Sequence, residues 1–163
     1  MMSNNLILTQ AKVDQIIQRI AYQIYENNMD DDVVLVGVDL GGRKLAEQIK
    51  ETLNRISRKR SSCYSVTLDK QDPLLNDISI DGDINVLDDK TIILCDDVLN
   101  TGRTLAYCLA KLLAFKVKRV ETAVLALRTH GRFPIYATYK GYELSTTINE
   151  HVEVVPGKGI YLN

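Results

Sequence analysis

Two adjacent acids follow one of the apolar stretches of this chain. Residues 92–95 are apolar, and Asp96 and Asp97 come directly after them. Neighbouring carboxylates repel each other, and partial burial raises the cost unless something compensates their charge. Sugar hydroxyls can donate to such a pair, and a divalent cation can neutralise it. The two acids are therefore candidate ligands for a sugar diol.

Residues 100–104, Asn-Thr-Gly-Arg-Thr, carry groups suited to a phosphate. Thr101 and Thr104 offer hydroxyl donors, and Gly102 allows the backbone to come close to a ligand. Leucines recur at helical spacing over residues 105–113, so a helix begins directly after this run, and its N-terminus would attract an anion. Acids for a sugar beside donors for a phosphate suit a ribose 5-phosphate. The alternative is a solvated strand end followed by a helix N-cap.

A second run with phosphate-binding character follows the apolar residues 33–38. It consists of Asp39, Leu40, Gly41, Gly42 and Arg43. Backbone N–H groups at the two glycines could face an anion at the start of another helix, and the alternative is a tight turn between strand and helix. A nucleotide-binding P-loop is excluded, because Arg43 and Lys44 stand where that motif has lysine and then serine or threonine.

The spacing of apolar residues predicts a fold in which strands and helices alternate. Helices are expected over residues 9–28, 45–56 and 105–113, and strands over 33–38, 62–68, 91–95 and 120–127. The polar residues 69–84 are expected to form a mobile loop, and short strands and turns are expected from Phe133 onward. Alternating elements form a parallel sheet with right-handed crossovers, so the fold class is α/β. Ligands of such sheets bind at the C-terminal ends of the strands.

Length and composition indicate one globular domain. The chain has 163 residues, of which 45% are hydrophobic and 25% charged, which is ordinary for a folded protein. Its net charge of −1 draws in no nucleic acid globally, so an anion site must be built locally. We expect neither a signal peptide nor a membrane partner, and the odd number of cysteines fits a reducing compartment. A cytoplasmic enzyme or regulator is the expectation.

The string from Ile92 to Thr104, IILCDDVLNTGRT, resembles the motif with which type I phosphoribosyltransferases bind phosphoribosyl pyrophosphate. The resemblance covers most of the chain. It implies a central parallel sheet flanked by helices, with a small hood of short strands. It also implies one domain over residues 1–163, with the hood built mainly from about 128–163.

The resemblance implies a role for each part of the site. Asp96 and Asp97 would hold the ribose hydroxyls, directly or through Mg²⁺, and residues 39–43 would bind pyrophosphate. The 5-phosphate would be cradled by Asn100, Thr101, Gly102, Arg103 and Thr104. The base would be contacted by Val98, Leu127, Arg128 and Thr129. Lys70 would act in catalysis within a lid at residues 69–84, and the partners would be phosphoribosyl pyrophosphate and a nucleobase.

Within that family the chain is similar to the bifunctional pyrimidine operon regulators and uracil phosphoribosyltransferases. The order of elements and the run Arg128, His130, Pro134, Ile135 carry this similarity, which implies uracil as the acceptor. The chain departs from the pyrimidine group at Leu127, where that group has aspartate. It also departs at residues 69–72, where the pyrimidine group has Tyr-Arg-Asp-Asp. Hypoxanthine-guanine enzymes instead carry an acid at the position of Asn100. A purine acceptor and an RNA-binding attenuation regulator with weak or no catalysis remain alternatives.

A basic cluster is the sequence feature that favours RNA. It consists of Arg55, Arg58, Lys59 and Arg60, which could contact several phosphates of an RNA leader. The alternative is a solvated group of cations at the favourable C-terminal end of a helix. By resemblance, we also expect the chain to form a homodimer or a larger homo-oligomer.

Overall fold

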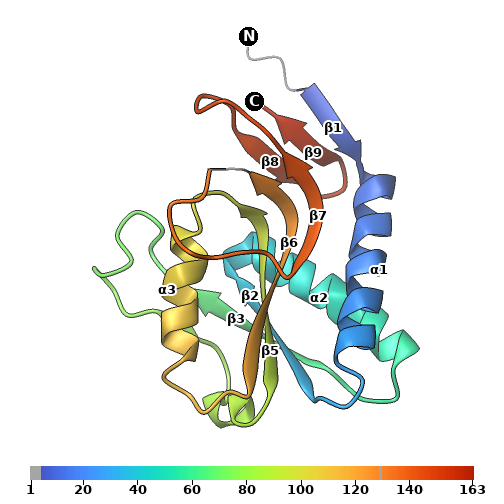
Figure 1. Ribbon diagram of the computed structural model, residues 1–163, viewed down its shortest axis with the longest axis vertical. Coiled ribbons are helices and arrows are strands. Elements are labelled where there is room, and N and C mark those ends of the chain that lie inside the picture. The colour runs from blue at the N-terminus through green and yellow to red at the C-terminus, as the bar shows by residue number, and fades with distance from the viewer. Residues whose placement is uncertain (1–4, 129) are drawn as a thin grey trace.

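A computed structural model describes residues 5–128 and 130–163 of the chain. Its larger sheet has the strand order β4-β3-β2-β5-β6-β7, and every neighbouring pair is parallel except β3 and β4 (Figure 1). The bounds of its strands are β2 Val33–Val38, β3 Ser62–Thr67, β4 Ser79–Ile80, β5 Thr91–Leu99, β6 Arg119–Arg128 and β7 Tyr139–Leu144. The α/β class and the central parallel sheet expected from the sequence are confirmed.

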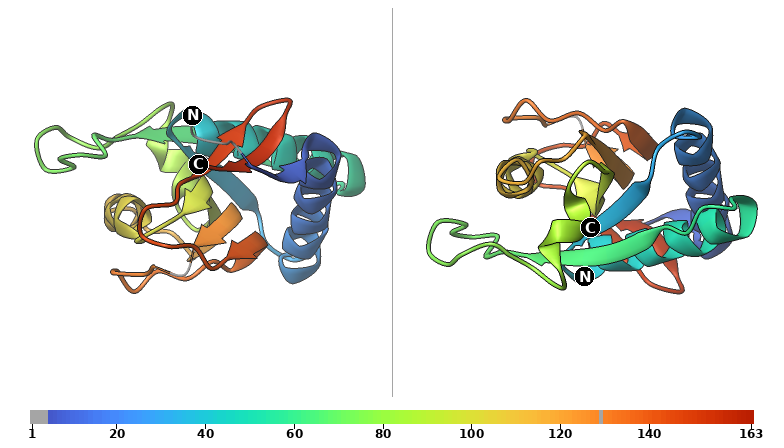
Figure 2. Two further views of the ribbon diagram at one scale, coloured as in Figure 1. Left: turned by 90° about the horizontal axis from the view of Figure 1, so that it is seen from above. Right: turned by 90° about the horizontal axis from the view of Figure 1, so that it is seen from below.

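Helices cover both faces of this sheet (Figure 2). They are α1 (Gln10–Asn27), α2 (Asp39–Ile56), the 3₁₀ helix η1 (Ile84–Leu87) and α3 (Arg103–Leu112). The apolar faces of α1 and α2 pack on one side of the sheet, against residues such as Ile93 and Leu125. Leu105 and Cys108 of α3 pack on the other side, against residues such as Leu94. The alternation of side chains along each strand thus divides the core into two layers.

A small antiparallel sheet sits above the C-terminal ends of the central strands (Figure 1). It has the order β1-β9-β8, from strands Asn5–Thr9, Gly159–Leu162 and Val152–Val155. The segment from about residue 128 therefore does two things, because residues 139–144 pair with β6 in the central sheet while residues 152–162 form two strands of the small one. The third strand, β1, comes from the other end of the chain.

Three expected boundaries were wrong. Strand β5 does not end at Cys95 but runs to Leu99, because its pairing with β6 continues through Asp96 and Val98. The second helix, expected over residues 45–56, begins at Asp39, so residues 39–43 are its first turn. Residues 69–84 are not one loop, since they contain β4 and the start of η1; the segment between β3 and β4 projects away from the body (Figure 2).

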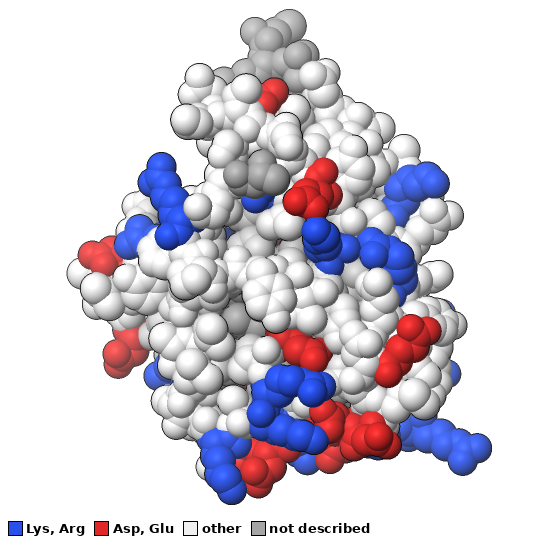
Figure 3. All heavy atoms as spheres, viewed as in Figure 1, with Lys and Arg blue, Asp and Glu red and all other residues white. Residues whose placement is uncertain are grey.

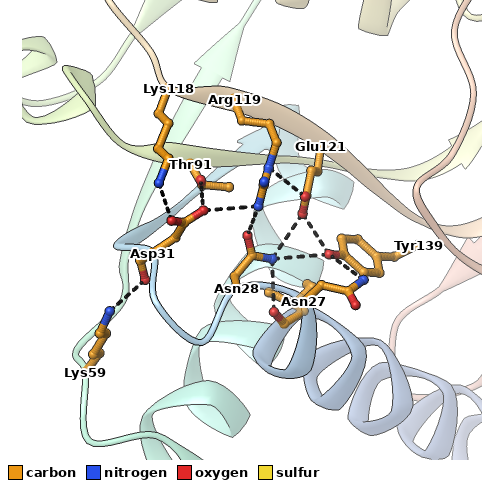
Figure 4. A network of polar contacts seen from close by, with 10 residues as sticks. Asn27, Asn28, Asp31, Lys59, Thr91, Lys118, Arg119, Glu121 and Tyr139 are labelled. Carbon is orange, nitrogen blue, oxygen red and sulfur yellow. Dashed lines mark hydrogen bonds and ion pairs between the residues drawn. The ribbon is translucent and has the colours of Figure 1, made fainter.

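A polar network joins the N-terminal ends of the strands, at the end of the sheet away from the small sheet (Figure 4). The carboxylate of Asp31 accepts from Lys118, from Thr91 Oγ1 at 2.9 Å and from Arg119 at 3.1 Å. Arg119 also pairs with Glu121 at 2.9 Å, and the hydroxyl of Tyr139 donates to Glu121 at 2.7 Å. The network ties β5, β6 and β7 to the turn before β2.

Candidate active site

Residues 100–104 connect the end of β5 to the first turn of α3, and a cavity of about 110 Å³ opens there. Its lining brings together Lys70, Asp96, Val98, Leu99, Asn100, Thr101, Gly102, Arg103, Thr104 and Leu105. Nine of these residues are close in sequence, but Lys70 reaches the cavity from the segment after β3. The cavity combines a carboxylate, a cation and the N-terminus of α3, which is the arrangement expected of a sugar-phosphate site.

The turn before α3 is held in place by its backbone. Gly102 has a φ of +85°, in the left-handed region that favours glycine, and the first turn of α3 begins at Arg103. The carbonyl oxygen of Thr101 accepts from the N–H groups of Arg132 and Phe133, at 2.9 and 3.0 Å. The turn is therefore braced by the segment after β6, and the start of α3 stays open to the cavity.

Asp96 is a buried acid inside this cavity, with 4% of its surface exposed. One carboxylate oxygen accepts from the N–H of Asp97 at 2.9 Å. Burial raises the pKa of the Asp96 carboxyl well above its usual range, and the neighbouring charge of Asp97 raises it further. A ligand that donates hydrogen bonds to Asp96, or brings positive charge near it, would offset this cost.

Asp97 faces a different cavity, of about 300 Å³, between α2, the start of α1 and the small sheet. Its carboxylate lies against the first turn of α2, where a Cβ on Gly41 would come within 2.4 Å of Asp97 Oδ2. A Cβ on Gly42 would lie 2.3 Å from the carbonyl oxygen of Cys95. The two glycines thus let the start of α2 pack directly on β5, which brings the N-terminus of α2 to Asp97.

Charged side chains lie around the first turn of α2, and one of them, Lys44, lines the cavity beside Asp97. Asp39 adopts a φ of +49°, and its carboxylate lies 3.6 Å from Lys70 Nζ. Arg43, expected to face pyrophosphate, instead pairs with Glu47 one turn further along the helix, at 3.0 Å. Lys70 is therefore the cation that the fold brings toward both helix N-termini, because it pairs with Asp39 and also lines the cavity at Asp96.

The residues expected to contact a base lie around the end of β6. Leu127 and Arg128 line a cavity of about 350 Å³ that also reaches Asn100, and Val98 is half-buried in the neighbouring strand. Thr129, expected beside them, lies outside the described residues. The guanidinium of Arg128 is buried and donates to Asn100, Thr146 and Thr147. Sequence spacing gave no signal for the two threonines, because they meet Arg128 only through the pairing of β6 with β7.

A metal held by protein side chains alone finds no support in the described part of the chain. No three His, Cys, Asp or Glu side chains among residues 5–128 and 130–163 come together as ligands. Mg²⁺, however, is commonly bound by one or two carboxylates together with phosphate oxygens of a substrate. Asp96 and Asp97, each at the edge of a cavity beside a helix N-terminus, fit a magnesium ion that arrives with its ligand.

Fold and site together define an α/β protein with two cavities, each beside a helix N-terminus, at the C-terminal ends of β2 and β5. Residues 3–157 match the family model described as the phosphoribosyl transferase domain, and the chain belongs to this family. It is 31% identical over 160 residues to the bifunctional protein PyrR of Haemophilus ducreyi, covering 91% of this chain and 88% of that protein. It is 35% identical over 159 residues to the protein of the same name from Alkaliphilus metalliredigens, covering 91% of this chain and 86% of that protein.

Solved structures show the same fold at low identity. A hypoxanthine-guanine phosphoribosyltransferase of Bacillus anthracis aligns with a TM-score of 0.72 at 19% identity, over 86% of this chain and 82% of that one. A hypoxanthine phosphoribosyltransferase of Staphylococcus aureus aligns with a TM-score of 0.74, also at 19% identity, over 91% and 80%. These likenesses confirm the fold and leave the acceptor open.

Across the described helices, none is long and apolar enough to cross a membrane.

Proposed function

We propose that this chain transfers the 5-phosphoribosyl group from phosphoribosyl pyrophosphate to a nitrogen of uracil, with release of pyrophosphate. The observation that carries the proposal is the cavity at the start of α3, which holds Asp96, Lys70 and the Thr101–Thr104 turn. The choice of uracil rests on the similarity to the pyrimidine group and to the PyrR proteins. Because the described cysteines are all free thiols, a reducing cytoplasmic location is proposed with it.

In this proposal the protein mainly positions its substrates and stabilises charge. The N–H groups at the start of α3 and the hydroxyls of Thr101 and Thr104 hold the 5-phosphate. Asp96 and Asp97, whose carboxyls are close enough for the charge of Asp97 to raise the pKa of Asp96, accept from the ribose hydroxyls. Pyrophosphate leaves toward the first turn of α2, and Lys70 neutralises part of its charge.

Asp96 and Asp97 would also hold the Mg²⁺ ion that accompanies phosphoribosyl pyrophosphate. That ion supplies positive charge to the leaving pyrophosphate. Its proximity would also favour the ionised form of Asp96, whose pKa burial raises.

The decisive experiment is a panel of acceptors. The purified protein is mixed with Mg²⁺, phosphoribosyl pyrophosphate and one base at a time, and pyrophosphate release is measured for uracil, hypoxanthine, guanine, xanthine, adenine and orotate. Uracil alone should support release, and Asp97→Asn should reduce it. Release with a purine alone would replace uracil by a purine acceptor, and no release with any of the six would refute the transferase proposal for these bases.

A second candidate function, RNA-binding regulation, is favoured by the basic cluster at the C-terminal end of α2. Arg58, Lys59 and Arg60 are exposed there, and Lys59 donates to the carbonyl of Asp31 at 3.3 Å. On the face in Figure 3, basic and acidic side chains are interspersed, so this cluster would have to act locally. Binding to the leader of its own operon should be steeply salt-dependent and should be abolished by Arg58→Glu with Arg60→Glu. The same affinity in that variant would exclude the cluster as the RNA site.

A further inference from the structure

Arg128 is a buried arginine whose hydrogen bonds go to two separate loops. It is 8% exposed, and Nε donates to Thr146 Oγ1 at 2.8 Å while one terminal nitrogen donates to the carbonyl of Thr147 at 3.1 Å. The other terminal nitrogen donates to Oδ1 of Asn100 at 3.2 Å. A single guanidinium thus joins the turn before α3 to the segment that follows β7.

The segment after β7 is itself fixed around this arginine. The ring of His130 contacts the carbonyl oxygen of Thr146 at 2.6 Å through Nε2. Glu150 accepts from the N–H of Thr147 at 2.6 Å and from its hydroxyl at 3.0 Å. Arg128 therefore has a firm anchor on one side, and Asn100 is the partner that it orients on the other.

The chemistry of arginine determines which way the Asn100 amide faces. A guanidinium can only donate hydrogen bonds, so the Asn100 atom that meets it must be the carbonyl oxygen. The amide nitrogen then points away from Arg128, and within the described residues no hydrogen-bond acceptor meets it. Asn100 is exposed, so among the residues that the structure describes nothing prevents the two N–H donors of this nitrogen from meeting a ligand.

A cavity beside Asn100 has room for a nucleobase and offers it polar groups and one apolar side chain. It has a volume of about 500 Å³ and is lined by Asn100, Thr101, Arg128, His130, Gly131, Arg132 and Ile148. Ile148 is a large apolar side chain with 84% of its surface exposed, which offers an uncovered apolar wall. The cavity adjoins the turn before α3, since Asn100 and Thr101 also line the cavity at the start of α3.

We propose that Arg128 is a positioning residue that fixes Asn100 as a hydrogen-bond donor to the acceptor base. The base it selects carries a carbonyl oxygen or an unprotonated ring nitrogen at this point, and a base that presents an N–H there is disfavoured. This inference rests on the proposed transferase function and assigns a specificity role to the Asn100 side chain. The backbone of Asn100 remains part of the phosphate turn.

The test replaces the donor by an acceptor of the same size. Asn100→Asp is compared with Asn85→Asp, a charge-matched control at an exposed position in η1, at the far end of the sheet. Asn100→Asp should raise the KM for uracil roughly tenfold, the scale of one lost hydrogen bond, and the KM for phosphoribosyl pyrophosphate is measured beside it because the new carboxylate also borders the phosphate turn. Arg128→Lys, which keeps the charge but loses the fixed geometry of the guanidinium, should raise the KM for uracil in the same way.

Analogues of the base identify the contact itself. Wild type should bind 2-hydroxypyrimidine or 4-hydroxypyrimidine, each of which lacks one carbonyl of uracil, more weakly than uracil. For one of the two, that difference should disappear in Asn100→Asp, which a purely structural role of Asn100 would not produce. If Asn100→Asp discriminates between the analogues as wild type does, or behaves like Asn85→Asp, the proposal is wrong even though the transferase activity stands.

A binding measurement separates this inference from the transferase proposal. The side-chain amide resonance of Asn100 is followed by NMR while uridine monophosphate is added to wild type and to Arg128→Lys. A shift in wild type that is weakened in Arg128→Lys supports the proposal even if no base is turned over. The absence of any shift in wild type overturns it.

Discussion

Asp96 and Asp97 are neighbours in sequence, yet each lines its own cavity. Asp96 belongs to the cavity at the start of α3, and Asp97 to the cavity beside α2. They can do so because both still lie within β5, where successive side chains point to opposite faces. The two carboxyls still repel each other, since the charge of Asp97 raises the pKa of Asp96, and each acid lies beside a different helix N-terminus.

Substitution of Lys70 is the most direct test of the proposed chemistry. Lys70→Ala should lower kcat by roughly ten- to a hundredfold, since it removes a cation from the leaving-group side of a transition state that needs charge stabilisation. The measurement is steady-state pyrophosphate release with the accepted base. Lys116→Ala is the control, because Lys116 pairs with Asp89 at the other end of the sheet. Equal kcat in both variants would remove Lys70 from the catalytic machinery.

Gly42 is required by packing, at a position where the helix start and the strand nearly touch. Gly42→Ala would place a Cβ 2.3 Å from the carbonyl of Cys95 and 3.2 Å from the Cα of Asp96, so α2 must move. The variant should lose about 1–3 kcal/mol of stability, measured by urea unfolding. Gly131→Ala is the matched control, because a Cβ there meets nothing within 4 Å. A Gly42→Ala variant as stable as Gly131→Ala would show that this close contact carries no cost.

At the scale of elements, ion pairs and hydrogen bonds join the N-terminal ends of the strands. The pKa of the Asp31 carboxyl is held below its usual range, first by the hydrogen bond from Lys118 and then by that from Thr91. The ionised form is the one that these donors stabilise. The network therefore contributes most to the joining of β2, β5 and β6 when Asp31 is charged (Figure 4).

Asp31 gives a pH-dependent prediction with a definite sign. A lowered folded-state pKa means that its stabilisation is present above the unfolded-state pKa, near 3.8, and is lost as the pH falls through the folded-state value. Asp31→Asn should therefore lower the free energy of unfolding at pH 7, and the difference from wild type should shrink below about pH 4. Asp30→Asn, at the exposed neighbouring position, should have little effect at either pH. Urea unfolding at pH 7 and pH 3 checks this, and a difference that stays constant with pH would contradict it.

At the scale of the whole molecule, both ends of the chain build the small sheet over the site. β9 lies between β1 and β8, with Leu6 opposite Tyr161 and Val154 opposite Ile160. Its backbone is thus paired on both sides, and the cavity beside Asp97 is closed partly by Val154, Pro156 and Gly157. Loss of β1 would make β9 an edge strand, with one side of its backbone unpaired.

Removal of residues 1–9 tests whether the small sheet is a separate unit. Amide hydrogen exchange in residues 152–162 should become at least about tenfold faster, while peptides from β2 and β5 keep their protection, because the two sheets have separate hydrogen-bond ladders. Mass spectrometry of the exchanged protein gives both readings at once. Faster exchange in β2 and β5 as well would mean that the small sheet stabilises the entire molecule.

The sequence by itself determined the class and the order of the elements. The apolar runs at 33–38 and 91–95 and the helical spacing over 9–28 were confirmed as β2, β5 and α1, because burial on a sheet or helix face leaves a local pattern. The grouping of Asp96 with residues 100–104 was also a local property. The family that the string Ile92–Thr104 indicated is confirmed by the match over residues 3–157.

Only the tertiary structure decided what meets across distance. Three contacts join segments that the sequence separates. Lys70 pairs with Asp39, and Arg128 donates hydrogen bonds to Asn100 and Thr146. Gly42 packs closely against Cys95. The boundary errors have the same origin, since β5 is prolonged past its apolar run by hydrogen bonds to β6. Strand pairing and helix packing are non-local, so periodicity along the chain predicts which faces are buried but not which residues come together.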